Sequence, residues 1–161
     1  MRLPLFVLGL SFLLLFSACS NVDLIATDSK TIQEHLSNYK GEKAVLLNVW
    51  ATTCAPCVEE FPMIVSLGNE IKDLEVVFVS ADFDDQLGEV KSYLNEQKVT
   101  GVSFIKNEND QSFINGIHPE WFGSLPFTIF YGKISGKILI FWEGKESESK
   151  FREAIQRAIN E

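Results

Sequence analysis

Two cysteines separated by two residues carry most of the chemical information in this chain. Cys54 and Cys57 follow the apolar run 44–50 and stand where a helix is expected to begin. A cysteine at a helix N-terminus faces unpaired backbone N–H groups and the positive end of the helix dipole, and both stabilise its thiolate. The pKa of such a cysteine falls, to roughly 3.5–7.5 in Cys-X-X-Cys sites. The spacing therefore predicts a reactive dithiol in which Cys57 can close a disulfide.

Other uses of cysteine fit the sequence less well. A structural zinc site needs four ligands, but there is no second Cys-X-X-Cys motif, and His35 and His118 are distant in sequence. Covalent haem attachment requires histidine directly after the second cysteine, where this chain has Val58. A purely structural disulfide remains as an alternative, although so short a loop would stabilise the fold only weakly. We therefore expect no metal site, and no cofactor beyond the redox-active pair Cys54 and Cys57.

The N-terminal segment is typical of an export signal. A single basic residue precedes the apolar stretch 5–16, which is shorter than the roughly 20 residues of a membrane-spanning helix. The segment 16–19, Phe-Ser-Ala-Cys, resembles the lipobox of bacterial lipoproteins, with Phe16 in place of the usual leucine. We expect residues 1–18 to be a lipoprotein-type signal peptide and Cys19 to carry lipid that holds the protein to the membrane. An uncleaved anchor and plain secretion are the alternatives.

Length and charge narrow the class of protein further. Without residues 1–18 the chain has 143 residues, the size of one domain. The full chain has 14 basic and 22 acidic residues and a net charge of −8, which offers no electrostatic footprint for nucleic acid. We assign residues 19–29 to a tether and residues 30–161 to the domain. An edge segment of the fold is the alternative for residues 20–28.

The hydrophobic pattern predicts alternating strands and helices. Helices are expected over 31–39, 56–71, 87–97 and 148–159, and strands over 44–50, 75–81, 127–131 and 137–142. The continuous apolar run 44–50 is typical of a central strand that is buried on both faces. The order of the elements indicates an α/β fold in which a central mixed β-sheet is flanked by helices.

Taken together, these features resemble thioredoxin. The residues that carry the resemblance are the string 48–62, Asn-Val-Trp-Ala-Thr-Thr-Cys-Ala-Pro-Cys-Val-Glu-Glu-Phe-Pro, and Leu-Pro-Phe-Thr at 125–128. More narrowly, the chain resembles the TlpA/ResA-like branch of exported, membrane-tethered thioredoxins. The resemblance covers residues 30–160 and implies the thioredoxin fold.

The resemblance implies a role for each matched residue. Cys54 would be the exposed nucleophile and Cys57 the buried resolving thiol. Pro126 would be a cis-proline that faces the disulfide and keeps metal ions from the thiols, with an ordinary turn proline as the alternative. The backbone of Leu125 would meet an extended substrate strand. Trp50 would pack beside the active site; simple core burial is the other role, and the two are compatible.

The resemblance also raises the question of which group moves the proton of Cys57. Asn48 stands where cytosolic thioredoxins carry a buried acid, and the exported branch commonly has asparagine there. The candidates are Glu60, one turn into the helix, and Asp82, at the end of the second predicted strand. Structural roles are the alternatives, because an acid in a first helical turn complements the dipole and Asp82 can serve as a turn or capping acid.

Residues 100–123 give the weakest indication of secondary structure in the chain. His118, Trp121 and Phe122 lie shortly before Pro126, in the region that borders the substrate groove in the family. We expect core packing and one hydrogen-bonded histidine here. A grip on a partner peptide by the two aromatic residues is the alternative.

The resemblance implies thiol–disulfide exchange as the reaction. The Cys54 thiolate would attack a partner disulfide, and Cys57 would resolve the mixed disulfide, which leaves the partner reduced. Expected partners are exported proteins with cysteine pairs, such as apocytochrome c, and a membrane electron donor that restores the dithiol. Three alternatives stay open: a protein disulfide oxidase or isomerase on the same fold, a metallochaperone, and a non-catalytic surface lipoprotein with a structural disulfide.

Overall fold

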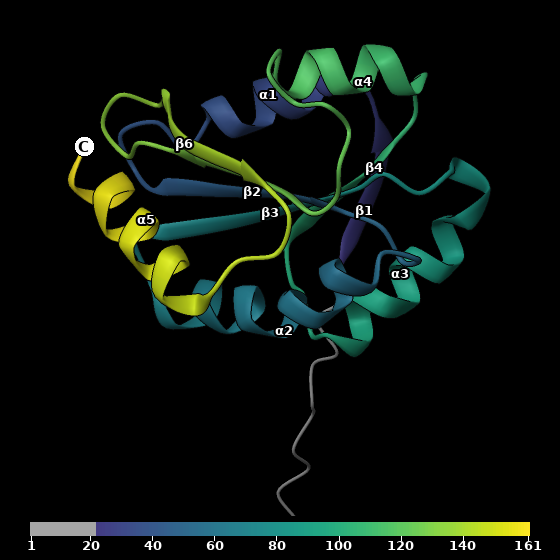
Figure 1. The fold of residues 1–161 in the computed structure, drawn as a ribbon, viewed down its shortest axis with the longest axis horizontal. Coiled ribbons are helices and arrows are strands. Elements are labelled where there is room, and N and C mark those ends of the chain that lie inside the picture. The colour runs from purple at the N-terminus through teal and green to yellow at the C-terminus, as the bar shows by residue number, and fades with distance from the viewer. Residues whose placement is uncertain (1–21) are drawn as a thin grey trace, which may run out of the picture.

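The computed structural model describes residues 22–161, which form a six-stranded mixed β-sheet with helices on both faces (Figure 1). The strands are β1 Asp23–Thr27, β2 Ala44–Trp50, β3 Leu74–Ser80, β4 Val102–Lys106, β5 Phe127–Tyr131 and β6 Ile138–Glu143. The helices are α1 Ser29–Ser37, α2 Ala55–Glu70, α3 Leu87–Glu96, α4 Asp110–Ile117 and α5 Glu148–Asn160, and a short 3-10 turn, η1 Asp84–Gln86, precedes α3. This is the α/β fold that the sequence predicts. Among the described residues, no helix has both the length and the apolar character needed to cross a membrane.

The strand β2 occupies an interior position in the sheet, as its composition predicts. The strand order is β1-β4-β3-β2-β5-β6, and β2 pairs in parallel with β3 and antiparallel with β5. All seven residues of β2 are buried. The chain therefore leaves β2 near the middle of the sheet and reaches Cys54 four residues later.

Alternate side chains of β2 contribute to two separate cores. Figure 1 shows α1 and α4 over one face of the sheet and α2, α3 and α5 over the other. Leu46 and Trp50 point to the second face and pack in the same cluster as Phe61 of α2. Val49 points to the first face and packs with Phe113 of α4. Because successive side chains in a strand point to opposite faces, one seven-residue segment ties both layers together.

The N-terminal boundary of the domain lies earlier than the sequence predicts. Residues 23–27, which we assigned to a tether, form the edge strand β1 and pair in parallel with β4. Val22 is also buried, and its N–H donates to Asn95 Oδ1 at 3.3 Å. The tether assignment is therefore corrected for residues 22–29, and the alternative of an edge segment holds. The predicted signal peptide and Cys19 lie outside the described residues.

Two elements fall in the stretch that gives no clear pattern. The strand β4 is largely buried, but it includes the polar residues Ser103 and Lys106, which are 1% and 7% exposed and conceal its apolar character. The helix α4 has only eight residues and is capped by Asn109, whose side chain accepts a hydrogen bond from the Ser112 N–H at 3.0 Å. A short helix contains too few turns for its periodicity to stand out.

Removal of one aromatic ring from the core between α2 and the sheet should destabilise the fold strongly. Phe61 is fully buried, with ring centroids at 4.8 Å from Trp50, 4.1 Å from Phe78 and 5.1 Å from Tyr93. Phe61→Ala should lower the free energy of unfolding by about 3–5 kcal/mol. Phe122→Ala is the control, because Phe122 is 90% exposed, and its effect should stay within about 0.5 kcal/mol. Urea unfolding measures both, and equal effects would contradict this assignment of the core.

Candidate active site

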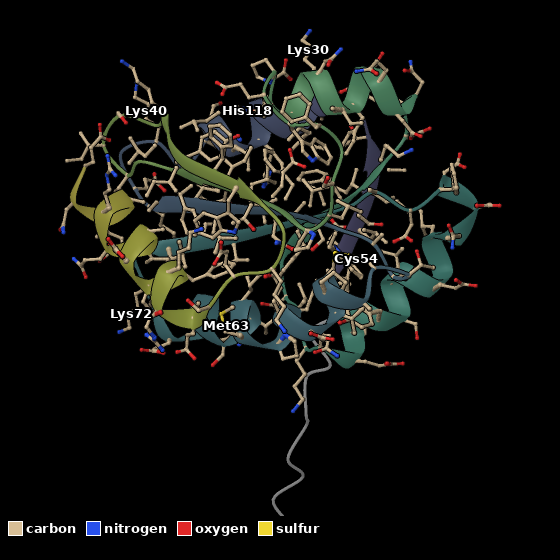
Figure 2. All side chains as sticks on the ribbon, in the orientation of Figure 1. Lys30, Lys40, Cys54, Met63, Lys72 and His118 are labelled. Atoms are coloured by element: carbon tan, nitrogen blue, oxygen red, sulfur yellow. A yellow bond between two sulfur atoms is a disulfide. The ribbon has the colours of Figure 1, made fainter. Side chains whose placement is uncertain are left out.

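Cys54 and Cys57 form a disulfide at the N-terminus of α2, with their Cα atoms 5.3 Å apart. Cys54 is the N-cap residue of the helix, and its Sγ accepts a hydrogen bond from the Cys57 N–H at 3.3 Å. Figure 2 shows Cys54 where α2 begins. Cys54 is half-buried, whereas Cys57 is 1% exposed. The helix thus leaves one sulfur within reach of a partner and hides the other.

The local sequence explains why the helix begins at this point. The Cys54 N–H donates to the Ala51 carbonyl at 3.1 Å, which closes a tight turn directly after β2. Pro56 lies in the first turn of α2, where its missing N–H costs no hydrogen bond. The Val58 N–H then donates to the Cys54 carbonyl at 3.0 Å and starts the helical ladder. A thiolate at Cys54 would therefore lie against the free N–H groups of a helix start.

Asp82 holds the loop that leads from β2 to Cys54. Its carboxylate accepts hydrogen bonds from the Thr52 N–H at 3.0 Å, the Thr52 hydroxyl at 2.8 Å and the Ser80 hydroxyl at 2.6 Å. Asp82 is 5% exposed, so these donors replace the water that its charge would otherwise require. The contacts join the carboxyl ends of β2 and β3. Asp82 therefore fulfils the turn-stabilising role that the sequence left open.

Glu60 lies in a buried hydrogen-bonded network one turn after Cys57 on α2. Its carboxylate accepts from Asn48 Nδ2 and from the Glu146 N–H, each at 3.3 Å. Asn48 also donates to the Thr128 hydroxyl at 3.1 Å. Glu60, Asn48 and Thr128 are all at most 2% exposed. The network connects β2, α2 and β5 with the loop before α5.

Burial gives Glu60 an unusual acidity. Desolvation raises its pKa from 4.5 to about 7, against the opposing effects of the Glu146 N–H, the Asn48 amide and the positive charge of Lys145. The neighbouring carboxylate of Glu146 adds a small rise. A carboxyl with this pKa changes its protonation state near neutral pH. It can therefore accept or release a proton under ordinary conditions.

The segment that contains Leu125 and Pro126 reaches the same edge of the sheet as the disulfide. The Leu125–Pro126 peptide bond is cis, as the resemblance implied. Phe127, the first residue of β5, pairs with Val49 near the carboxyl end of β2. Because β2 leads directly to Cys54, this register brings the cis-proline segment to the active-site end of the strand. Leu125 is half-buried and Pro126 is buried.

Trp50 is a core residue at the end of β2. It is fully buried, and its ring centroid lies 4.8 Å from both Phe61 and Tyr93. Its indole N–H has no hydrogen-bond partner among the described residues. The contacts show the core role, and the same buried cluster includes Cys57, so Trp50 also packs beside the active site.

The aromatic residues before Pro126 divide into buried and exposed members. Trp121 is 4% exposed and stacks on Phe127 at 4.8 Å, and His118 is 6% exposed and lies 4.2 Å from the Phe141 ring. His118 Nδ1 also accepts a backbone N–H at 3.2 Å. The expected core packing and hydrogen-bonded histidine are thus confirmed for these two residues. The expectation of core packing is wrong for Phe122, which is 90% exposed. Its side chain points into solvent, whereas that of the adjacent Trp121 points into the core.

A groove of about 180 Å³ lies beside the cis-proline segment and was not predicted. Its lining includes Ala81, Ile114, Trp121, Leu125 and Lys106. The lining residues come from the connection after β3, the end of β4, the helix α4 and the connection before β5, which are distant in sequence, so no motif could have revealed the groove. The groove adds a recess of apolar side chains, bordered by the Lys106–Asp110 ion pair, to the edge of the sheet that holds Cys54.

Comparison with known proteins places these features in a wider group. A sequence model of the AhpC/TSA family matches residues 19–139. The thiol-disulfide oxidoreductase ResA of Bacillus thuringiensis subsp. konkukian is 24% identical over 135 residues, which cover 84% of this chain and 74% of that protein. ResA of Bacillus subtilis is 34% identical over 88 residues, or 55% of this chain and 46% of that protein.

Solved structures agree with the fold. A thioredoxin-family thiol:disulfide interchange protein from Chlorobium tepidum matches with a TM-score of 0.63 and 23% identity, over 76% of this chain and 83% of that one. The pneumococcal exposed lipoprotein thioredoxin from Streptococcus pneumoniae matches with a TM-score of 0.59 and 20% identity, over 76% and 89% of the two chains. At these identities the likeness shows a common thioredoxin-like fold.

Glu60 should make stability depend on pH in a specific direction. Its pKa is about 7 in the folded protein against an ordinary value of 4.5, so the folded state keeps the proton between these two values. The contribution of Glu60 to the free energy of unfolding should be greatest below pH 4.5, fall as the pH rises and level off above about pH 7. The fall attributable to this group is at most about 3 kcal/mol.

Glu60→Gln removes the titrating group and should remove this fall. Urea unfolding between about pH 5 and pH 8 measures the slope in both proteins. Glu59→Gln is the matched control, because Glu59 is the exposed neighbour and pairs with Lys145 at 2.6 Å. If Glu60→Gln keeps the parent slope, the buried carboxyl is not its source.

Proposed function

Because this chain belongs to the AhpC/TSA family and is a thiol–disulfide oxidoreductase with a thioredoxin-like fold, we propose that it reduces disulfide bonds in exported proteins. The observation that carries the proposal is the unequal burial of the two sulfurs at the start of α2. Cys54 is half-buried and Cys57 is 1% exposed. This asymmetry supports Cys54 as the nucleophile and Cys57 as the resolving thiol.

The reaction proceeds in two exchanges. The Cys54 thiolate attacks one sulfur of the substrate disulfide, that bond breaks, and the other substrate sulfur leaves as a thiolate that takes a proton from water. The Cys57 thiolate then attacks the Cys54 sulfur and releases the second substrate thiol. Two electrons pass to the substrate, and the Cys54–Cys57 disulfide remains. A membrane electron donor restores the dithiol, and no further cofactor is needed.

Glu60 is the proposed acceptor for the proton of Cys57. Cys57 is buried, so its proton needs a local acceptor before the second exchange. Glu60 lies on the same helix one turn later and has a pKa of about 7, and Asn48 holds its carboxylate in place. Asp82, the other candidate, accepts hydrogen bonds from three donors on the loop and on β3, which supports a structural role for it instead.

The substrate binds as an extended segment beside the cis-proline. The backbone of Leu125 offers pairing to a substrate strand, and Pro126 orients it towards the disulfide. Two exposed rings, Phe83 at 64% and Phe122 at 90%, and the groove beside Leu125 add apolar surface at this edge. These features support a substrate with an apolar side chain close to its cysteine. Apocytochrome c and other exported proteins with cysteine pairs belong to this class.

Export and anchoring complete the proposal. The segment 16–19 supports cleavage before Cys19 and lipid attachment to that cysteine. A structural relative from Streptococcus pneumoniae is named an exposed lipoprotein thioredoxin, which is consistent with such an arrangement. The protein would then act on the outer side of the bacterial cytoplasmic membrane.

Two other functions receive less support. A metallochaperone would need further ligands beside the dithiol, but within residues 22–161 no three histidine, cysteine, aspartate or glutamate side chains form a potential metal cluster. A purely structural disulfide does not account for the titrating carboxyl of Glu60 next to it. A protein disulfide oxidase or isomerase would use the same residues in the reverse direction, so the redox equilibrium of the pair decides between them.

Loss of the resolving thiol should trap substrates. Cys57→Ala should accumulate mixed disulfides through Cys54, because the second exchange can no longer occur. Cys54→Ala is the control and should accumulate few, since its remaining thiol is buried. Non-reducing gels followed by mass spectrometry of cell extracts measure both. If neither variant captures a protein, the proposed reaction loses its main support.

Glu60→Gln should slow the second exchange more than the first. At neutral pH the decrease should be on the order of 100-fold, the usual contribution of a general base. The rate should also lose its dependence on a group with a pKa of about 7. Rapid-mixing kinetics with a protein disulfide across a pH series separate the two steps, and Glu59→Gln serves as control. An unchanged pH profile in Glu60→Gln would exclude Glu60 as the acceptor.

Cys19→Ala should abolish lipid labelling and block normal processing. Cleavage at the same place without lipid would leave Phe16 at a position that requires a small residue. Metabolic labelling with a radioactive fatty acid and the mass of the processed chain measure the result. A correctly processed, soluble Cys19→Ala protein would point to plain secretion.

A further inference from the structure

Charge is divided between the two edges of the sheet, although the whole chain is acidic. Four connections lie at the edge where the parallel strands begin: 38–43, 71–73, 97–101 and 132–137. Together they contain six lysines and two acids, a net charge of +4. These four connections form the basic edge. The connections at the opposite edge are residues 28, 51–54, 81–86, 107–109, 118–126 and 144–147. Together they contain seven acids and one lysine, a net charge of −6. The second set includes Cys54, so the active site lies on the acidic side.

Contacts between the four connections make the basic edge one continuous surface. The Gly41 N–H donates to the Lys133 carbonyl at 2.7 Å, and Lys133 Nζ lies 2.7 Å from Asp73 Oδ1. A groove of about 200 Å³ is lined by both Lys43 and Lys98, and so joins the first connection to the third. The lysines are therefore neighbours in space although they are scattered in sequence.

Most of the positive charge on this surface is free. Lys43 pairs with Glu75 and Lys133 with Asp73, each at 2.7 Å. The other four lysines are exposed and form no salt bridge within residues 22–161: Lys40, Lys72, Lys98 and Lys137. In Figure 2, Lys40 and Lys72 lie at the left of the view, and Cys54 lies right of centre. Lys40 and Lys72 therefore stand apart from the disulfide.

The β5–β6 hairpin adds an apolar tip to the basic edge. Ile134 is 65% exposed and lies between Lys133 and Lys137 in sequence. Glu161 accepts a hydrogen bond from the Ser135 hydroxyl at 2.7 Å, so one acid joins this end of the hairpin. An exposed aliphatic side chain flanked by lysines is the combination that enters the interface of a charged bilayer.

The N-terminal chain joins the fold at the basic edge. The Asp23 N–H donates to the Gly101 carbonyl at 2.9 Å, within the connection that carries Lys98. Cys19 precedes the buried Val22 by three residues, and three residues of chain span at most about 11 Å. A lipid on Cys19 therefore keeps this part of the domain close to the bilayer. This step rests on the anchoring in the proposed function.

We propose that the basic edge lies on an anionic lipid surface and directs the active site away from the membrane. Each lysine near such a surface strengthens binding about fivefold, whereas the acidic edge is repelled. The seven residues of β2 separate the two edges by roughly 20 Å, at about 3.3 Å per residue. Cys54 then faces the aqueous side, and a membrane electron donor must reach it with a part that stands clear of the lipid.

Hydrogen exchange on the membrane-bound protein tests this orientation. The processed chain is reconstituted into vesicles of phosphatidylcholine alone or mixed with phosphatidylglycerol, and amide exchange is followed by mass spectrometry. Residues 97–101 and 132–137 should exchange more slowly in the phosphatidylglycerol vesicles, while residues 81–86 and 107–109 should not change. High salt should reduce the protection, because it screens the lysines.

Paired charge variants identify the surface. K40Q/K98Q should make contact between the basic edge and the lipid less favourable. The ratio of molecules with this edge on the lipid to molecules with it free should fall on the order of twenty-fold, at about fivefold per lysine. K30Q/K150Q is the matched control, since it removes two exposed lysines from the first turns of α1 and α5 near the acidic edge, and it should keep the protection. Equal urea midpoints show that both variants are folded. The proposal would be overturned if both variants lost protection equally, or if protection were the same with and without phosphatidylglycerol.

The mass of the N-terminal peptide reports the lipid separately. If Cys19 carries none, the anchoring in the proposed function fails, and the same vesicles are then added to the unlipidated chain. Protection of residues 97–101 and 132–137 in that mixture still supports a lipid-binding basic edge. The proposal is overturned if these residues are not protected, or if they are protected only when a membrane protein is added.

Discussion

The rest of the site is arranged around a carboxyl group that is sealed inside the protein one turn after the disulfide. Glu60 is 2% exposed, and burial raises its pKa to about 7. Hydrogen bonds from Asn48 and the Glu146 N–H fix its position but do not cancel the cost of burial. Asn48 also contacts Thr128, two residues after the cis-proline. The buried carboxyl, the helix that carries the disulfide and the strand that follows the cis-proline therefore share one buried network.

The rest of the fold keeps this network and the disulfide in register. The strand β2 is buried along its whole length and lies between β3 and β5, so its carboxyl end cannot move without disturbing both cores. Asp82 ties the next loop to β3 through Thr52 and Ser80. Cys54 thus caps α2 from a well-packed loop, with its sulfur against the N–H groups of the helix start. The two acidic groups have different surroundings: Asp82 holds a loop, and Glu60 is the buried group that we propose as the proton acceptor.

Much of this arrangement was predictable from the sequence, because its central parts have strong local signals. The strand β2 is an unbroken apolar run, and Cys54 with Pro56 marks the start of α2. The family resemblance located the cis-proline at Pro126. The sequence favoured a tether over the edge strand β1, which has no clear alternation, and gave no sign of β4, which buries Ser103 and Lys106. The three-dimensional structure was also needed to show the different surroundings of Glu60 and Asp82. It was needed again to show that lysines from four distant connections lie together.

The central claim, that the Cys54–Cys57 pair serves as a reductant, is tested most directly by its reduction potential. The purified protein is equilibrated with thiol–disulfide buffers of defined potential, and the reduced fraction is counted by alkylation and mass spectrometry. The account predicts a potential near that of reducing thioredoxins, about −270 mV. A value near about −120 mV, typical of strong oxidants, would contradict it and assign the same residues to disulfide formation.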